Sequence, residues 1–162
     1  MSRRLIPLPF AALAAIFTLV VWPAAGYATS RTQTLRFFDK QVSIKLTHAN
    51  GTVVTDPQSI QPKPGDTLDI DSLDYSGTHA HHTKQWTAST HLRCTFPTPG
   101  GPPTCESHVA IGGSMLIFTG NPGTISNGTG IYQDATGRVT SAKDVKGQND
   151  ASDLVVKIKL RS

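Results

Sequence analysis

Three of the six histidines stand almost side by side, at His79, His81 and His82. In an extended strand, His79 and His81 point to one face with Cα atoms about 6.6 Å apart. Two imidazoles so placed can share a metal ion if a neighbouring strand supplies a third ligand, for which His91 and His108 are candidates. The alternatives are a polar loop and a set of acid/base groups in a pocket, because imidazole titrates near neutral pH.

Aromatic, imidazole and guanidinium side chains recur along the same stretch and are candidates for the wall of a binding pocket. These pocket candidates are Tyr75, His79, His81, His82, Trp86, His91 and Arg93. Small-molecule pockets combine apolar and aromatic walls with a few polar groups. Tyr75, Trp86 and Arg93 are equally suited to packing against a core and capping it. No residue is assigned a catalytic role.

Two further patterns superficially suggest chemistry, and the sequence argues against both. Asp69, Asp71 and Asp74 are closely spaced, but they lack the Gly and the terminal Glu of a calcium loop, so we expect a solvated strand face. Gly112-Gly113-Ser114 lacks the G-x-S-x-G pattern and a strand-to-helix context, which excludes a serine hydrolase of that type.

The two cysteines, Cys94 and Cys105, flank a stretch rich in Pro and Gly. In an oxidising compartment such a pair usually forms a disulfide. The alternative is a catalytic thiol, which a second cysteine at hairpin distance disfavours. We therefore predict a Cys94–Cys105 bridge that ties two neighbouring strands together.

Most of the chain alternates apolar and polar residues with a period of two, which predicts β-strands. The predicted strands cover a first segment at Phe37 and Phe38, then residues 42–47, 67–75, 84–94, 109–118, 137–143 and 154–161. Gly, Pro and Asn clusters separate them, and no useful helical period is present. This pattern predicts an all-β sandwich or barrel, and a closed barrel of about eight strands removes exposed edges.

The N-terminus has the pattern of a secretory signal peptide, with Arg3 and Arg4 before an apolar run and small residues up to Ala28. A membrane anchor is the alternative, but Pro7 and Pro9 interrupt the run. Removing 28 of the 162 residues leaves 134, and losing the two arginines lowers the formal charge from +4 to +2. We expect one domain, residues 29–162, that is secreted to the extracellular, cell-wall or periplasmic space. So small a charge, without a basic cluster, argues against a nucleic-acid partner, and signal cleavage leaves no stable membrane insertion.

The segment from Asn127 to Val139 resembles the G-G-T-G-x-Y-x-x-A-x-G signature of the allene oxide cyclase and dirigent superfamily. The signature aligns with Asn127, Gly128, Thr129, Gly130, Tyr132 and Gly137. All of these match the family residue except Asn127, where the family commonly has Gly. A Pro-Gly-Asp before a strand, a mid-chain cysteine pair and an alternating last strand are also similar, so the resemblance covers roughly residues 33 to 162. Tyr132 is expected to start a strand after the glycine turn.

The resemblance implies an eight-stranded antiparallel barrel with an apolar cavity for a small hydrophobic molecule, no cofactor and assembly as a homotrimer. It also implies that the cavity steers a cyclisation or coupling, as an isomerase or dirigent protein does. The family's catalytic carboxylate and thiol have no counterpart that we can place, so allene oxide cyclase and lignan-coupling activities are not carried over. The alternatives are a non-catalytic secreted barrel and a metal-binding protein built on the histidine cluster.

Overall fold

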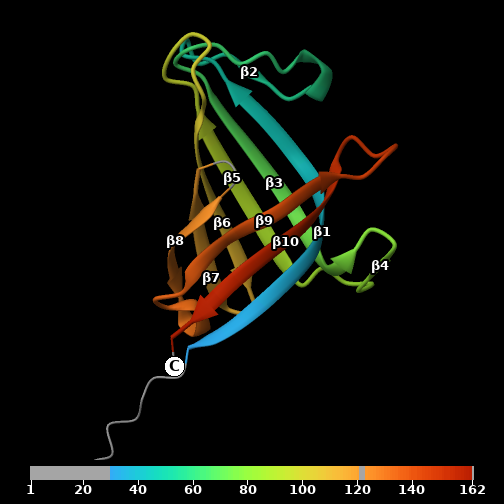
Figure 1. Ribbon diagram of the computed structural model, residues 1–162. Helices are drawn as coiled ribbons and strands as arrows, with labels where there is room; N and C mark the ends of the chain where they lie inside the picture. The colour runs from blue at the N-terminus through green and yellow to red at the C-terminus, as the bar shows by residue number, and fades with distance from the viewer. Residues whose placement is uncertain (1–29, 121–122, 162) are drawn as a thin grey trace, which may run out of the picture.

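The computed structural model describes residues 30–120 and 123–161 and shows an all-β fold (Figure 1). Its wall consists of β1 (Arg31–Thr47), β3 (Thr67–Thr78), β5 (Ala88–Thr95), β6 (Thr104–Ile111), β7 (Ser114–Thr119), β8 (Thr124–Thr129), β9 (Thr136–Asp144) and β10 (Ala151–Leu160). The short elements are β2 (Val53–Val54), β4 (His81–His82) and the 3₁₀ turns η1 (Pro57–Ser59) and η2 (Gly130–Tyr132). The predicted signal peptide, residues 1–28, lies outside the described residues. Within those ranges, no helix has the length and apolar character needed to span a membrane.

The barrel closes because β1 pairs with a neighbour on each of its sides. The order around the wall is β1-β10-β9-β8-β7-β6-β5-β3, and β3 pairs back onto β1, with every pairing antiparallel. Residues 31–40 of β1 pair with β10, and residues 37–47 pair with β3 around a bulge between Gln41 and Ser43. The predicted eight-stranded antiparallel barrel is confirmed, and the two strands expected around Phe37 and Val42 form one long strand.

The segment 109–118, expected as one strand, is a hairpin of β6 and β7. Gly112 and Gly113 form its two-residue turn, with φ angles of +54° and +79°. Such angles suit the tight turns that join antiparallel strands, and glycine adopts them without steric cost. The turn reverses the chain, so Val109 and Leu116 become cross-strand partners that both contribute to the buried core.

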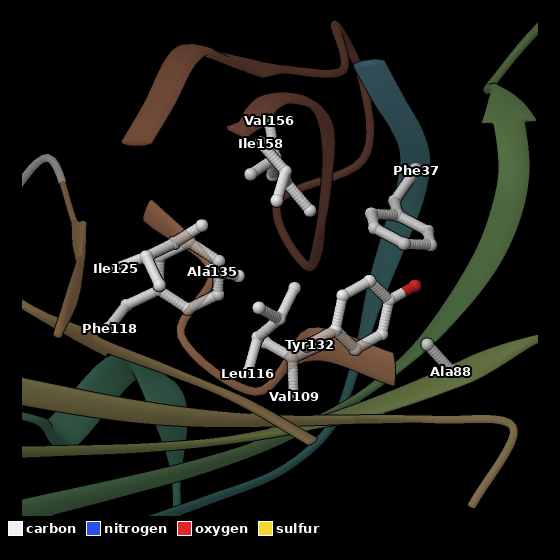
Figure 2. Close-up of a cluster of buried hydrophobic side chains, with 10 residues drawn as sticks. All are labelled: Phe37, Ala88, Val109, Leu116, Phe118, Ile125, Tyr132, Ala135, Val156 and Ile158. Atoms are coloured by element: carbon white, nitrogen blue, oxygen red, sulfur yellow. The ribbon is translucent and has the colours of Figure 1, made fainter. Parts of the chain in front are cut away.

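A cluster of buried apolar side chains fills part of the barrel interior (Figure 2). Tyr132 comes from η2, and its ring lies among wall residues that include Phe37, Ala88 and Leu116. Each large apolar side chain buried in this way contributes about 1.5–3 kcal/mol relative to an exposed one. The plug formed by η2 therefore closes off one part of the interior and stabilises the wall around it.

A second, smaller cluster lies around Phe38, the residue next to inward-facing Phe37. Phe38 packs with Val145 and Ala151 and with the half-buried Tyr75. The His82 ring covers it, with ring centroids 4.9 Å apart, and also meets the Tyr75 ring edge-on at 5.3 Å. The hairpin of β3 and β4 thus shields an apolar side chain that alternation would otherwise leave in water.

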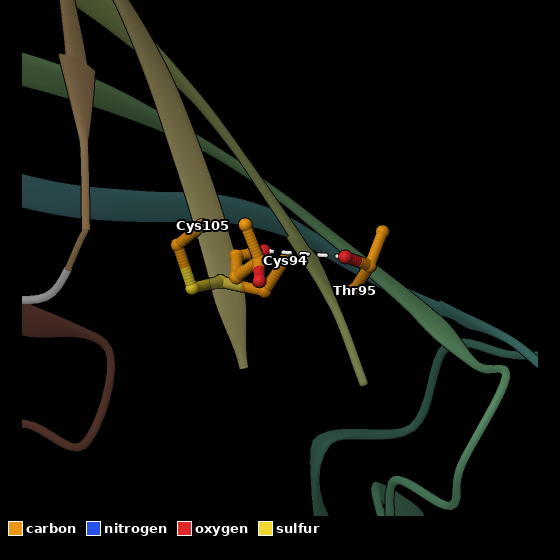
Figure 3. Close-up of a disulfide and its surroundings, with 4 residues drawn as sticks. Cys94, Thr95 and Cys105 are labelled. Carbon is orange, nitrogen blue, oxygen red and sulfur yellow. Dashed lines mark hydrogen bonds between the residues drawn. A yellow bond between two sulfur atoms is a disulfide. The ribbon is translucent and has the colours of Figure 1, made fainter. Parts of the chain in front are cut away.

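The predicted disulfide between Cys94 and Cys105 is present (Figure 3). The two cysteines are directly opposite each other on β5 and β6, with Cα atoms 4.1 Å apart. The bridge closes the Pro- and Gly-rich loop between them and leaves no free cysteine in the described part of the chain.

Replacing both cysteines, as Cys94→Ala/Cys105→Ala, should lower the free energy of unfolding by about 2–4 kcal/mol, because the unfolded chain regains the entropy that the closed loop removes. Urea denaturation at fixed pH measures the loss. Wild-type protein treated with reductant should lose a similar amount. A double variant as stable as the oxidised wild type would contradict this account.

Candidate functional site

The barrel interior holds a cavity of about 430 Å³ that adjoins the core cluster, since Phe37, Val109 and Leu116 belong to both. Its wall is mainly apolar and draws on seven of the barrel strands, with Leu35, Ile70, Leu92, Val109, Leu116 and Val156 among the lining residues. The cysteine bridge also belongs to this lining. The volume falls in the range of small-molecule pockets, roughly 300–1,000 Å³.

Alternation along the strands decides which side chains reach this cavity. On β3, Ile70, Ser72 and Asp74 face inward, and on β5, Thr90 and Leu92 do so. Because successive side chains point to opposite faces, every intervening residue of these strands faces outward. The inward-facing polar side chains Ser72, Asp74 and Thr90 therefore lie among apolar ones. They are the places where the cavity wall can form hydrogen bonds with a bound molecule.

The most unusual feature of the cavity is a pair of carboxyl groups, Asp39 on β1 and Asp74 on β3. The two residues are directly opposite each other in the β1–β3 ladder, and both line the cavity. Asp74 is only 1% exposed, and the Thr90 hydroxyl donates to its Oδ2 at 2.6 Å. Its Oδ1 is buried and accepts no hydrogen bond from a donor group. A proton shared between the two carboxyl groups would satisfy that oxygen.

The electrostatics agree with a shared proton. Burial is the largest cause of a raised pKa at Asp74, and together with the hydrogen bond and negative charge of Asp39, against the lowering effect of Thr90, it brings that pKa to about 8. Burial also raises the pKa of Asp39, while hydrogen bonds with Asp74 and Ser72 act in the opposite direction. Ionising both carboxyl groups costs free energy, because the two negative charges repel each other and Asp74 is almost fully buried. At neutral pH the pair therefore keeps a proton. The site can therefore donate and accept a proton near pH 7.

His91 and Arg93, two of the expected pocket residues, lie outside the lining and on the outer face of β5. Arg93 Nε donates to Asp69 Oδ1 at 2.7 Å, and His91 Nδ1 lies 2.7 Å from Asp71 Oδ1. Lys45 Nζ completes the arrangement at 3.7 Å from Asp69 Oδ2. These groups form a cross-strand polar ladder over β1, β3 and β5, in which Asp69 is buried beneath exposed basic partners.

The other expected pocket residues also lie outside the cavity lining. They belong to or flank the β3–β4 hairpin: Tyr75, His79, His81, His82 and Trp86. Tyr75 and His82 pack on Phe38, whereas Trp86 is 57% exposed. His79 Nδ1 lies 2.6 Å from Asp153 Oδ2, and the His79 backbone N–H donates to Asp153 Oδ1 at 2.7 Å. His79 thus fastens the hairpin to β10, and His82 covers the outer cluster.

The structure brings no third ligand to His79 and His81. Over residues 30–120 and 123–161, no three His, Cys, Asp or Glu side chains come close enough together to hold a metal ion. His91 and His108 are partners on neighbouring strands, and His108 Nε2 lies 2.7 Å from Glu106 Oε1.

The sequence does not single out Asp39, and the close spacing of Asp69, Asp71 and Asp74 predicts a solvated face. That interpretation is wrong for Asp74, which is buried and faces inward, and for Asp69, which is buried on the outer face beneath its basic partners. A signal was available, since Asp74 shares strand parity with the apolar Leu68 and Ile70. An acidic residue on an apolar face is costly unless it is paired or functional. Asp39 shares the parity of Leu35 and Phe37 in the same way, but the apolar Phe38 between them interrupts the alternation and hides this signal.

The glycine signature shapes the η2 plug and takes no part in the cavity lining. A Cβ at Gly128 would overlap the Tyr132 carbonyl oxygen, and one at Gly137 would overlap the Lys157 carbonyl oxygen. Gly130 has a φ of +60° and packs on Ser114, whose Oγ accepts from the Ile131 backbone N–H at 3.2 Å. Tyr132 lies in the 3₁₀ turn η2, so the expectation that it starts a strand is wrong.

Comparison with known proteins places this geometry in a known fold. No family model matches the sequence, and no curated protein matches it. Among solved structures, the pterocarpan synthase dirigent protein GePTS1 superposes with a TM-score of 0.57 at 15% identity, covering 84% of this chain and 93% of that one. Pyocyanin demethylase gives a TM-score of 0.49 at 19% identity, covering 80% and 99% respectively. The chain therefore has a dirigent-like β-barrel fold.

The carboxyl pair should make stability fall as pH rises from about 4 to about 8. Over that interval an unfolded aspartate is ionised while folded Asp74 keeps its proton, so the folded state binds more protons and loses stability with increasing pH. Asp74→Asn should remove most of this slope and exceed the wild type in unfolding free energy at pH 8 by roughly 1–3 kcal/mol. Urea denaturation at several pH values measures both effects.

Asp71→Asn is the matched control, since it makes the same change on the outer face of β3. Hydrogen bonds from Ser43 and His91 lower the pKa of Asp71, so its contribution is lost only as pH falls below the ordinary aspartate range. The decline between pH 4 and 8 should persist in this variant. An unchanged slope in Asp74→Asn would refute the raised pKa.

Proposed function

We propose that this barrel binds a small, mainly apolar molecule in its interior cavity. The observation that carries the proposal is a 430 Å³ cavity whose wall is apolar except for a few convergent polar groups, above all Asp39 and Asp74. Burial of apolar ligand surface supplies the driving force, and the polar groups orient the ligand. The cavity exists without any movement of the wall, which limits the ordering cost of binding.

The same cavity supports a cofactor-free isomerase or cyclase activity. A rigid apolar wall can hold a flexible reactive molecule in one folded geometry, which lowers the entropic cost of ring closure or coupling. A pair of carboxyl groups that shares one proton near neutral pH can donate that proton to a developing oxyanion, and its ionised member can take a proton from carbon. The fold shared with a protein named pterocarpan synthase is compatible with such steering, and the chemistry itself is our proposal for this chain.

Export belongs to the same proposal. The disulfide is compatible with an oxidising compartment, where such bridges form and persist. The signal-peptide pattern at residues 1–28 supports the same location. The homotrimer that the family resemblance implies stays a prediction, which native mass spectrometry of the exported form measures.

A pair of tryptophan substitutions on β6 tests the cavity. Ser107 lines the cavity, whereas Ala110 on the same strand has the opposite parity and is exposed. We expect wild type to bind the neutral fluorescent probe N-phenyl-1-naphthylamine saturably, because an apolar pocket excludes water from the dye. Ser107→Trp should weaken binding by about tenfold or more, since the indole occupies the space the probe needs.

Ala110→Trp should bind the probe as the wild type does, because its indole lies outside the barrel. Circular dichroism and thermal melting establish that both variants are folded. Equal binding by the two variants, or wild-type protein without saturable binding, would contradict a ligand-binding interior.

A further inference from the structure

The titratable side chains that line the cavity are all acidic. They are Asp39 on β1, Asp74 on β3, Asp144 on β9 and Asp150 in the loop before β10. The described part of the lining contains no Lys, Arg or His, and β5, β6, β7 and β8 add no titratable group to it. This contrasts with the whole chain, whose formal charge is +4. Among the described residues, the basic side chains lie outside this lining, and the cavity wall is electronegative.

The four carboxyl groups differ in depth, with one pair at the opening of the cavity and the other pair inside the barrel. Asp144 and Asp150 are exposed, so they mark the place where the cavity meets solvent. Asp74 is 1% exposed and Asp39 is half-buried, so this pair lies within the barrel. Carboxylates at an opening attract cations, and low-dielectric walls strengthen that attraction.

The deep pair also holds an unused hydrogen-bond acceptor. Asp74 Oδ1 is buried without a donor, while Oδ2 accepts from the Thr90 hydroxyl. A buried acceptor of this kind is costly unless a proton or a ligand donor satisfies it. The proton shared with Asp39 satisfies it before a ligand binds, and because both residues line the cavity, a bound molecule can supply a donor to the pair when that proton leaves.

We propose that the ligand is an organic cation, a small and mainly apolar molecule that carries one protonated amine. Its N–H groups donate to the carboxyl pair of Asp39 and Asp74, and its apolar body packs against the aliphatic and aromatic wall. This deepens the proposed function and rests on it. The arrangement selects against carboxylates and phosphates, since an anion in this cavity would meet only negative or neutral groups.

Cation binding is linked to the proton that the pair holds. An ammonium group beside Asp74 stabilises its ionised form, so the pKa of Asp74 falls and the shared proton leaves. At pH 7 the binding of an amine therefore releases a proton to solvent, and affinity rises as pH increases towards 8. A neutral ligand causes no such release.

Three probes with one skeleton test the inference on the wild-type chain without its signal segment. They are 2-naphthylmethylamine, 2-naphthylmethanol and 2-naphthoate, which are cationic, neutral and anionic at pH 7. Isothermal titration calorimetry should show the amine binding about ten- to a hundredfold more tightly than the alcohol, and the carboxylate binding least, because a charge-assisted hydrogen bond is added or a repulsion introduced. Titrations in buffers of different ionisation enthalpy should show proton release with the amine alone.

Asp74→Asn keeps the side-chain shape and removes the charge, so the preference for the amine should fall to less than about threefold. Asp39→Asn provides a second variant should the first fail to fold. Asp71→Asn, on the outer face of the same strand, should keep the full preference. A preference that survives in Asp74→Asn and Asp39→Asn would overturn the assignment to this pair.

The outcomes separate the two proposals. If the alcohol binds as tightly as the amine, the cation inference fails while the apolar binding site stands. If none of the three probes binds and N-phenyl-1-naphthylamine also fails to bind, the proposed function fails and the inference fails with it.

Discussion

Closure of the barrel through β1 is the constraint on which the rest of the structure depends. β1 pairs with β10 along one edge and with β3 along the other, and the two pairings overlap at residues 37–40. Once the sheet is closed, every strand has an inside and an outside, and alternation assigns each side chain to one of them. The same overlap places Asp39 directly opposite Asp74, so closure creates both the cavity and its acidic pair.

Burying the acidic pair lowers the stability of the folded state, and the rest of the interior offsets this loss. The core around Tyr132 and the cysteine bridge supply stability, whereas Asp74 is a buried carboxyl whose Oδ1 has no donor group beside it and depends on the proton shared with Asp39. Natural proteins accept such conflicts mainly at functional sites, where the strained or unpaired group does chemistry or meets a ligand. The buried carboxyl pair lies in the wall of a cavity, and this location connects the fold to the proposed function.

The outer surface shows why the conspicuous residues were poor guides to the site. His91 and Arg93 are engaged with Asp71 and Asp69 in a ladder across neighbouring strands. His82 covers Phe38, an apolar side chain on the outer face of β1. The chemical type of a side chain therefore does not predict whether it faces the inside or the outside of the barrel. Its odd or even position along the strand is a better predictor.

The sequence by itself determined the fold class, the disulfide and the set of residues that share a face on each strand. These are local properties, since a period of two and turn residues act over a few neighbours. Only the tertiary structure decided that Asp39 and Asp74 meet, that the 109–118 segment turns at Gly112 and Gly113, and that η2 carries Tyr132 into the interior. The physical reason is that register between strands distant in sequence, and the burial that shifts a pKa, exist only after the barrel has closed.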